Sequence, residues 1–148
     1  MTDAKIATSA EQPINRHAAV AGEPMHEGDL VGIDSNGHMV QADPEGVMAL
    51  GVCMTPADDL DNYQTDEVKL VIEAERALIG RDRVTATCYG VEVENGDGDW
   101  DFTPGLPVYM GAGGEFTQTA PASGGVQVVG SALTEDRIRL DVRPSSDW

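Results

Sequence analysis

The stretch GDLVGIDSNGHMVQADP at residues 28–44 is repeated in pattern by GLPVYMGAGGEFTQTAP at residues 105–121. The two stretches align without a gap at a shift of 105 − 28 = 77 positions. A little further on, residues 50–52 (LGV) match residues 129–131 (VGS), now two positions out of step. The aligned pairs are Gly28/Gly105, Val31/Val108, Ile33/Met110, Gly37/Gly114, Met39/Phe116, Gln41/Gln118 and Pro44/Pro121.

This repeat predicts the fold class. Each copy indicates a strand, a glycine turn, a second strand, a proline-led loop and a third strand. Two copies at so long a period exclude a solenoid. We therefore predict an all-β fold, a small single-domain β-barrel of β-tulip type or a sandwich, with two pseudo-repeated β units and long acidic loops. A length of 148 residues fits one domain.

The chain divides into three parts. Residues 1–16 are small and polar without a clear period, which is typical either of a frayed terminus or of an extended arm that orders on a partner. Residues 17–143 form the expected β domain, and residues 144–148 a tail. Acidic loops are expected at residues 56–66 and 95–101.

Within the β domain, the sequence predicts individual strands. Residues 30–34 and 38–42 flank an Asn36-Gly37 hairpin turn. Residues 83–94 alternate β-branched and polar side chains, and residues 137–142 place Arg outward with Ile, Leu and Val inward. Further apolar strands are expected at residues 17–22 and 47–55. Residues 68–75 begin like a strand and could turn helical at their end, and they follow the first unit as residues 137–142 follow the second.

The charge balance bounds the partners and the source. Lys and Arg total 9 against 26 Asp and Glu, a formal net charge of −17. High salt screens the resulting self-repulsion, because the Debye length falls to ~3 Å at 1 M. The composition thus favours a protein adapted to concentrated salt, with a mesophilic acidic protein that meets a basic partner as the alternative. Both interpretations argue against nucleic-acid binding, which needs Lys and Arg on phosphates.

The cysteines and the hydropathy pattern carry less information. Whether Cys53 and Cys88 pair is left open, and two buried free thiols are the favoured interpretation. The first 16 residues lack the apolar segment of a secretory signal. No run approaches the ~18 apolar residues that span a membrane. We expect a soluble chain that is made in the cytoplasm and binds no membrane.

One loop has the composition of a cation site. Residues 95–101 (NGDGDWD) place side-chain oxygens at alternate positions, which is how a loop wraps a hard cation such as Ca²⁺. The match to an EF-hand is poor, because Trp100 stands where a glycine is required. An acidic hairpin turn is the alternative. The candidate metal ligands are Asn95, Asp97, Asp99 and Asp101, and no other cofactor is indicated.

The remaining motifs point away from chemistry. His17, His26 and His38 lack the paired spacing of a zinc site. No nucleophile or phosphate-loop signature is present, so no catalytic residue is assigned and we expect that the chain is not an enzyme. The glycine-rich residues 111–114 lie between two expected strands and are interpreted as a hairpin turn.

Four stretches together resemble head decoration proteins of tailed viruses of bacteria and archaea, which are small β-rich capsid-cementing proteins. Residues 23–31 (EPMHEGDLV) are similar to the family's early G-D-x-V strand, and residues 50–53 (LGVC) to its G-V strand. Residues 105–110 (GLPVYM) resemble its later G-x-x-V-Y element. Residues 128–133 (VVGSAL) with residues 137–142 (RIRLDV) resemble its closing stretch, whereas the two acidic loops depart from the pattern.

The resemblance implies a virion structural protein. It implies a homotrimer on the surface of an icosahedral capsid, with the major capsid protein and the chain itself as partners. Combined with the acidic composition, it implies a virus of a halophilic archaeon. The expected contacts to the shell lie in the N-terminal arm, which should be disordered in the free protein. These residues are Thr2, Ala4, Ile6, Pro13, Ile14 and Arg16.

Three other functions stay open at this point. A head-fibre or tail component would form a ring or filament rather than a trimer. A β module that binds Ca²⁺ or a small ligand is the second alternative, and an enzyme is the least favoured.

Overall fold

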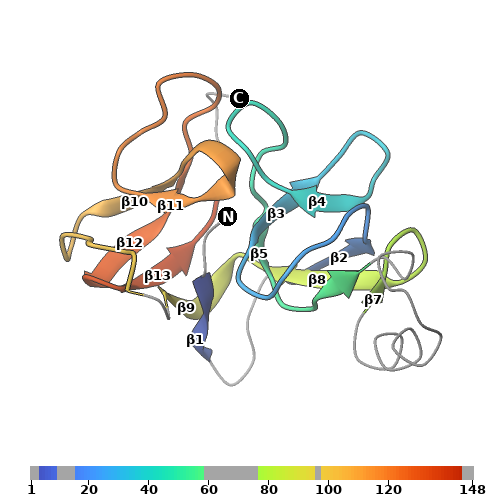
Figure 1. Cartoon of the computed structure of the whole chain (residues 1–148), viewed down its shortest axis with the longest axis horizontal. Coiled ribbons are helices and arrows are strands. Elements are labelled where there is room, and N and C mark those ends of the chain that lie inside the picture. The colour runs from blue at the N-terminus through green and yellow to red at the C-terminus, as the bar shows by residue number, and fades with distance from the viewer. Residues whose placement is uncertain (1–3, 10–15, 59–76, 96–97, 145–148) are drawn as a thin grey trace.

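The computed structural model describes residues 4–9, 16–58, 77–95 and 98–144, which form two β units side by side (Figure 1). The first unit holds a five-stranded antiparallel sheet, sheet B, and the second a six-stranded antiparallel sheet, sheet A. In spatial order, sheet B consists of β2 (Arg16–Val20), β8 (Arg83–Thr87), β5 (Gly51–Cys53), β3 (Leu30–Ile33) and β4 (Met39–Gln41). Sheet A consists of β1 (Ala4–Ser9), β9 (Tyr89–Asn95), β13 (Arg137–Asp141), β12 (Val128–Thr134), β10 (Pro107–Met110) and β11 (Phe116–Thr117).

Two short elements complete the described structure. β6 (Ala57–Asp58) and β7 (Ala77–Leu78) pair in parallel beside sheet B. The turn between β10 and β11 contains the 3₁₀ segment η2 (Ala112–Gly114). The described residues contain no α-helix, so the all-β prediction is confirmed. The sheets are open, so the closed barrel within that prediction is not formed.

The sequence repeat is a repeat of structure. β10 covers the residues of β3 shifted by 77, since 30 + 77 = 107 and 33 + 77 = 110. Leu30 pairs with Val52 across β3 and β5, and Pro107 pairs with Ser131 across β10 and β12. These partners correspond, because Val52 of the third strand in the first copy matches Ser131 in the second copy at a shift two positions larger than 77. The order β8-β5-β3-β4 in sheet B therefore matches β13-β12-β10-β11 in sheet A.

The same backbone hydrogen bonds recur in both copies. The amide of Gly28 donates to Cys53 O at 2.9 Å, and the amide of Gly105 donates to Ala132 O at 2.8 Å. Glycine is needed at the hairpin turn, because Gly37 and Gly114 have φ of 79° and 76°, the left-handed region that side chains with a Cβ avoid. The repeated glycines thus encode equivalent turns.

The core repeats as well. In the first unit Met25, Val31, Met39 and Cys53 are buried together. Their counterparts in the second unit are Phe102, Val108, Phe116 and Ala132, which are buried together in the larger core cluster. Larger aromatic side chains replace two methionines, so the second core is the bulkier one. This larger cluster also takes in Leu30, Ala42, Ala49 and Val52 of the first unit, so the two units share one hydrophobic interface.

Buried polar contacts reinforce the interface between the units. Gln127 is 2% exposed, and its amide donates to Ala49 O at 2.8 Å and to Arg143 O at 2.7 Å. Its Oε1 accepts from the Ala49 amide at 2.9 Å. The amide of Gly125 donates to Pro44 O at 2.7 Å. Among the residues that the structure describes, every buried side-chain nitrogen and oxygen has a hydrogen-bond partner, so the side chains of the joint carry no unsatisfied desolvation cost.

Some expected boundaries change. Residues 83–94 form two strands, because the chain passes from sheet B to sheet A at Cys88. The segment expected as an N-terminal arm contains β1, which pairs with β9, and Arg16 begins β2. In sheet B, β8 occupies the position that β13 occupies in sheet A. Residues 54–82 are inserted between β5 and β8, whereas β13 follows β12 almost directly. Residues 68–75, expected to take that place, lie outside the described residues.

We predict that alanine at either of two equivalent glycines destabilises the protein. A Cβ on Gly51 would clash with the backbone oxygen of Thr87, and one on Gly130 with the backbone oxygen of Arg139, so the paired strands would have to separate. We expect each substitution to lower the free energy of unfolding by about 1–3 kcal/mol, measured by urea denaturation at high salt. Gly46→Ala is the control, because its Cβ would have no neighbour closer than 3.6 Å. Equal losses at all three glycines would contradict the close-approach argument.

Candidate functional site

The solvent-facing side of sheet A is the candidate interaction surface. Strand side chains alternate between two faces. Val108, Met110, Ile138 and Leu140 point into the core, as the sequence predicted for residues 137–142. We call the opposite side the outer face. It includes Leu133, which lies within β12, and we count with it the exposed Leu106, which directly precedes β10. Its members are Tyr89, Glu92, Glu94, Leu106, Pro107, Tyr109, Val128, Ser131, Leu133, Arg137, Arg139, Asp141 and Arg143.

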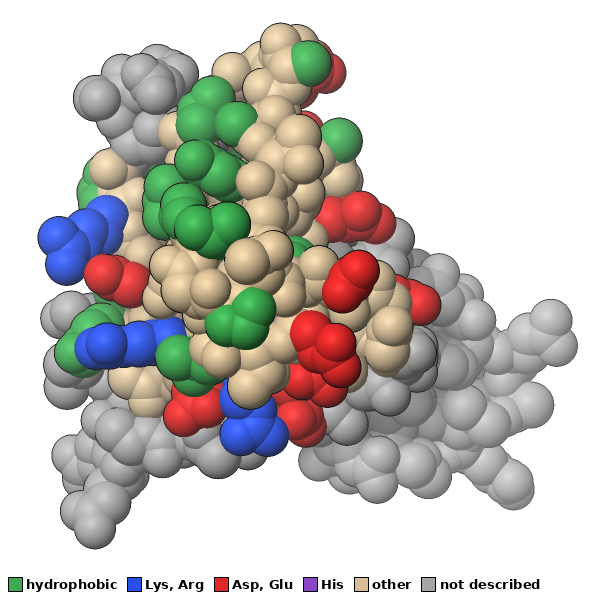
Figure 2. Space-filling model, turned by 90° about the vertical axis from the view of Figure 1, so that its left-hand side faces the viewer, with side chains coloured by type: hydrophobic (Ala, Val, Ile, Leu, Met, Phe, Trp, Pro, Cys, Tyr) green, Lys and Arg blue, Asp and Glu red, His purple; other side chains and the backbone are tan. Residues whose placement is uncertain are grey.

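The outer face carries most of the exposed large apolar side chains. Leu106, Val128 and Leu133 are 50%, 46% and 43% exposed, and Ile33 is the only other large hydrophobic residue exposed in the described part of the chain. Figure 2 views the end of the molecule that carries the second unit and shows hydrophobic side chains gathered there, with Arg and acidic side chains at their margin. Apolar side chains grouped in this way mark interaction surfaces more often than scattered ones do.

Arginines border the apolar residues. Arg137 lies 3.0 Å from Glu94 and 3.6 Å from Glu92, and the hydrogen bond with Glu94 raises the pKa of Arg137. The guanidinium of Arg139 lies 5.8 Å from the ring centroid of Tyr89 and donates to its hydroxyl at 3.3 Å. A shallow depression of about 460 Å³ lies over these strands, lined by Tyr89, Pro107, Val128, Ser131, Arg139 and Arg143 among others. Tyr, Arg and apolar side chains together are typical of protein interfaces.

A second hollow lies where the two units meet. It has a volume of about 590 Å³, and its walls are mainly apolar, with Ile33, Val47, Met48 and Leu50 from the first unit and Val142 from the second. His17, Asp34 and Arg143 supply polar groups at its walls. This hollow is continuous with the interface between the units.

Cys53 and Cys88 form no disulfide, which confirms the favoured interpretation for their pairing. Burial raises the pKa of Cys53 to about 12. Desolvation also raises the pKa of Cys88, which is only half-buried at the wall of the hollow between the units. Because the thiolate is the nucleophile, neither side chain has the electrostatic setting of a reactive cysteine.

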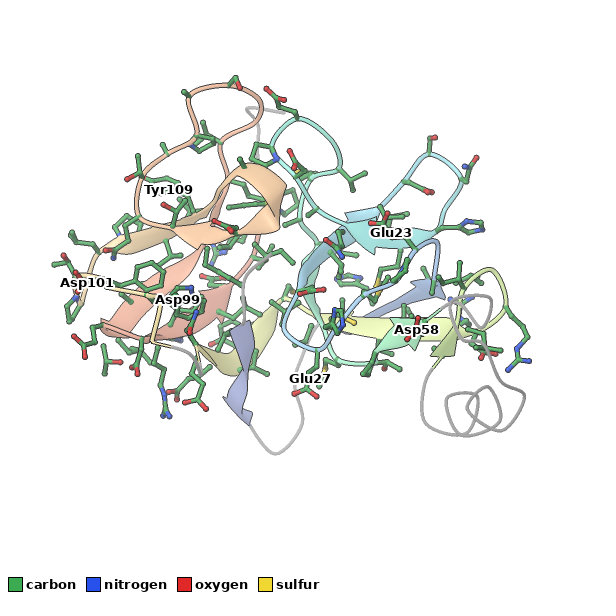
Figure 3. All side chains as sticks on the ribbon, viewed as in Figure 1. Glu23, Glu27, Asp58, Asp99, Asp101 and Tyr109 are labelled. Atoms are coloured by element: carbon green, nitrogen blue, oxygen red, sulfur yellow. The ribbon has the colours of Figure 1, made fainter. Side chains whose placement is uncertain are left out.

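The candidate cation loop does not gather its ligands among the described residues. Asn95 is buried and its Oδ1 accepts from the Asp99 amide at 3.4 Å, whereas Asp99 and Asp101 are exposed. Asp97 lies outside the described residues. Within the described ranges, no three His, Cys, Asp or Glu side chains lie close enough to share a metal ion. Figure 3 shows Asp99 and Asp101 at the second unit, far from Glu23, Glu27 and Asp58 at the first.

Trp100 anchors this loop. Its ring packs against Phe102 at 4.9 Å and Phe116 at 5.4 Å between centroids. The side chain that breaks the EF-hand pattern therefore closes one end of the second core. The glycine-rich residues 111–114 form the turn between β10 and β11, which confirms their interpretation as a hairpin turn.

The expected shell contacts fall on two strands and on undescribed residues. Ala4 and Ile6 lie in β1, opposite Asn95 and Val93 of β9, and Arg16 opens β2 opposite Thr87. Thr2, Pro13 and Ile14 lie outside the described residues. β1 is an edge strand of sheet A, so this part of the arm lies against the second unit.

Comparison with known proteins gives no match: no protein-family model fits the chain, and no curated protein has a similar sequence. The described residues include no helix with the length and apolar character needed to cross a membrane.

Asp29 provides a pH test of the fold around β3. Burial raises the pKa of its carboxyl group, although the His26 amide donates to it at 2.9 Å and lowers the pKa in part. The ionised form is thus less favourable in the folded chain. This cost is absent below the unfolded pKa, near 3.8, and grows as the pH rises through the higher folded pKa.

We predict that Asp29→Asn gains stability relative to the natural chain as the pH rises from 3 to 7. Urea denaturation of both proteins across this range measures the difference in free energy of unfolding. Asp99→Asn, at an exposed carboxylate, is the control. A difference between Asp29→Asn and the natural chain that does not change with pH would contradict the burial argument.

Proposed function

We propose that the chain is a virion structural protein that decorates and stabilises an icosahedral capsid as a homotrimer on its surface. Its partners are the major capsid protein and other copies of the chain. The proposal assigns it to a virus of a halophilic archaeon. The chain is made in the host cytoplasm and, in this proposal, is not an enzyme.

The observation that carries the proposal is the location of the stretches that resemble decoration proteins. Residues 23–31 and 50–53 lead into and form β3 and β5, and residues 105–110 end in β10. Residues 128–133 and 137–142 lie on β12 and β13. The resemblance therefore falls mainly on strands that build both units. A folded scaffold with an apolar, arginine-bordered face suits a protein that works by contact.

The physics of cementing favours such a module. A decoration protein gains affinity by touching several capsid subunits at once, so weak contacts add as avidity. A trimer presents each of its surfaces three times around one axis. Subunits that each carry −17 repel one another in dilute buffer, and molar salt removes most of this repulsion. Salt is therefore part of the assembly mechanism in this proposal.

The first test is the virus particle itself. We expect the chain in purified particles of the virus that encodes it, in a fixed ratio to the major capsid protein. Particles produced without the chain should lose DNA at a lower temperature, and the purified chain should bind them at molar salt and restore that temperature. Absence of the chain from purified particles would refute the proposal. An unrelated acidic protein of similar size serves as the control for nonspecific binding.

The second test is the salt dependence of assembly. We predict a trimer at molar salt and dissociation as the salt is diluted, because the screening length grows to ~10 Å at 0.1 M. Size-exclusion chromatography with light scattering measures the mass at each salt concentration. A chain that is monomeric at high salt and trimeric only at low salt would contradict this prediction.

A further inference from the structure

One cross-strand row of residues occurs at equivalent positions in both units, but it is buried in the first unit and largely exposed in the second. In the first unit, Leu30, Val52 and Thr87 pair in a row across β3, β5 and β8. They are 1%, 0% and 0% exposed. The equivalent row of the second unit crosses β10, β12 and β13 and is formed by Pro107, Ser131 and Arg139. Pro107 and Arg139 are exposed and Ser131 is half-buried.

The second unit covers the row of the first. Leu30 and Val52 belong to the core cluster that also contains Met110, Val129 and Leu140. Hydrogen bonds from the second unit reach the first unit beside this row, including Gly113 N to Asp43 Oδ2 at 2.9 Å and Gln127 Nε2 to Ala49 O at 2.8 Å. The turn at residues 111–114 and the loop before β12 thus hold the first unit from one side.

This contact is head-to-tail. If a two-fold axis related the units, both rows would be buried to the same extent, because the same patch would be used on each side. Instead, one row is buried and its counterpart lies on the outer face. A head-to-tail contact leaves one such face at the end of the chain, where another copy can continue the arrangement.

We infer that the outer face of the second unit is the docking site of a second copy of this chain, which binds through its first unit. Geometry rather than charge identifies this partner. The charges of the face are largely balanced on the face itself, because Arg137 pairs with Glu92 and Glu94, and Arg143 pairs with Asp141. A second copy is inferred because its first unit repeats the pattern of the second unit, which covers the equivalent row within one chain.

The apolar part of the face supplies the contact that salt does not weaken. Val128 and Leu133 lie on β12 on either side of Ser131, and the exposed Leu106 directly precedes Pro107. A rotation between copies that closes produces a ring. The docking face follows from the geometry of the repeat alone, and only the number of copies, three, rests on the proposed function.

Two substitutions test the face at molar salt. Val128→Asp places a negative charge in the apolar part of the outer face. Arg139→Glu replaces a positive side chain of the face with a negative one. Both side chains are exposed, so the fold should remain, which thermal melting checks. We expect each to weaken self-association at least about tenfold, the loss typical of a central interface residue. Val128→Thr and Ala122→Asp, the latter on an exposed loop outside the face, should assemble like the natural chain.

Mixing tests the head-to-tail geometry. A tagged Val128→Asp chain should still retain untagged natural chain, because its first unit is intact, but should not retain untagged Val128→Asp. Failure to retain the natural chain would overturn the head-to-tail inference. Unchanged assembly of both folded variants, or a natural chain that is monomeric at every salt concentration, would overturn the docking site. Neither result would exclude capsid decoration, because the chain could decorate as a monomer or through another face. Absence of the chain from purified particles would refute decoration but would not test the docking site.

Discussion

The burial of Leu30 and Val52 beneath the second unit is the contact on which the rest of the structure depends. These residues lie on β3 and β5, the strands that the repeat defines, so the strands that build the first unit also form its joint to the second. Gln127 holds the joint from the other side and satisfies the backbone of Ala49 inside it. One apolar row and one buried amide therefore make a two-unit chain into one body.

High salt weakens the charge interactions of this protein but leaves its apolar contacts in place. Ion pairs such as Arg137–Glu94 lie near the surface, contribute little to stability, and weaken further as salt is added. Apolar contacts are not screened, and excluded salts strengthen them. At molar salt the repulsion from a net charge of −17 fades while the apolar contacts persist. A surface that combines exposed Leu106 and Val128 with arginines at its border is thus suited to associate where salt is concentrated.

Local signals were sufficient to predict part of this fold. Gly37 and Gly114 mark turns because their positive φ is a local property, and the alternation at residues 137–142 fixes which side of β13 is buried. Signals that depend on distant partners failed. The alternation at residues 83–94 runs through Cys88 without showing that the chain changes sheets there. Gln127 resembles any polar loop residue, because its burial depends on Ala49, 78 positions away. The outer face was missed for the same reason, since exposure is decided by what another unit covers.

The divergence of the two copies shows how one unit came to serve two surroundings. Where the row is covered, it carries Leu30, Val52 and Thr87, and where it is open, the equivalent positions carry proline, serine and arginine. Beside the row the exchange runs the other way, because the buried Asp29 corresponds to Leu106, which is 50% exposed. Such a mixture of polar and apolar residues, intermediate between core and ordinary surface, is what a face needs when it must be soluble alone and dry in a complex.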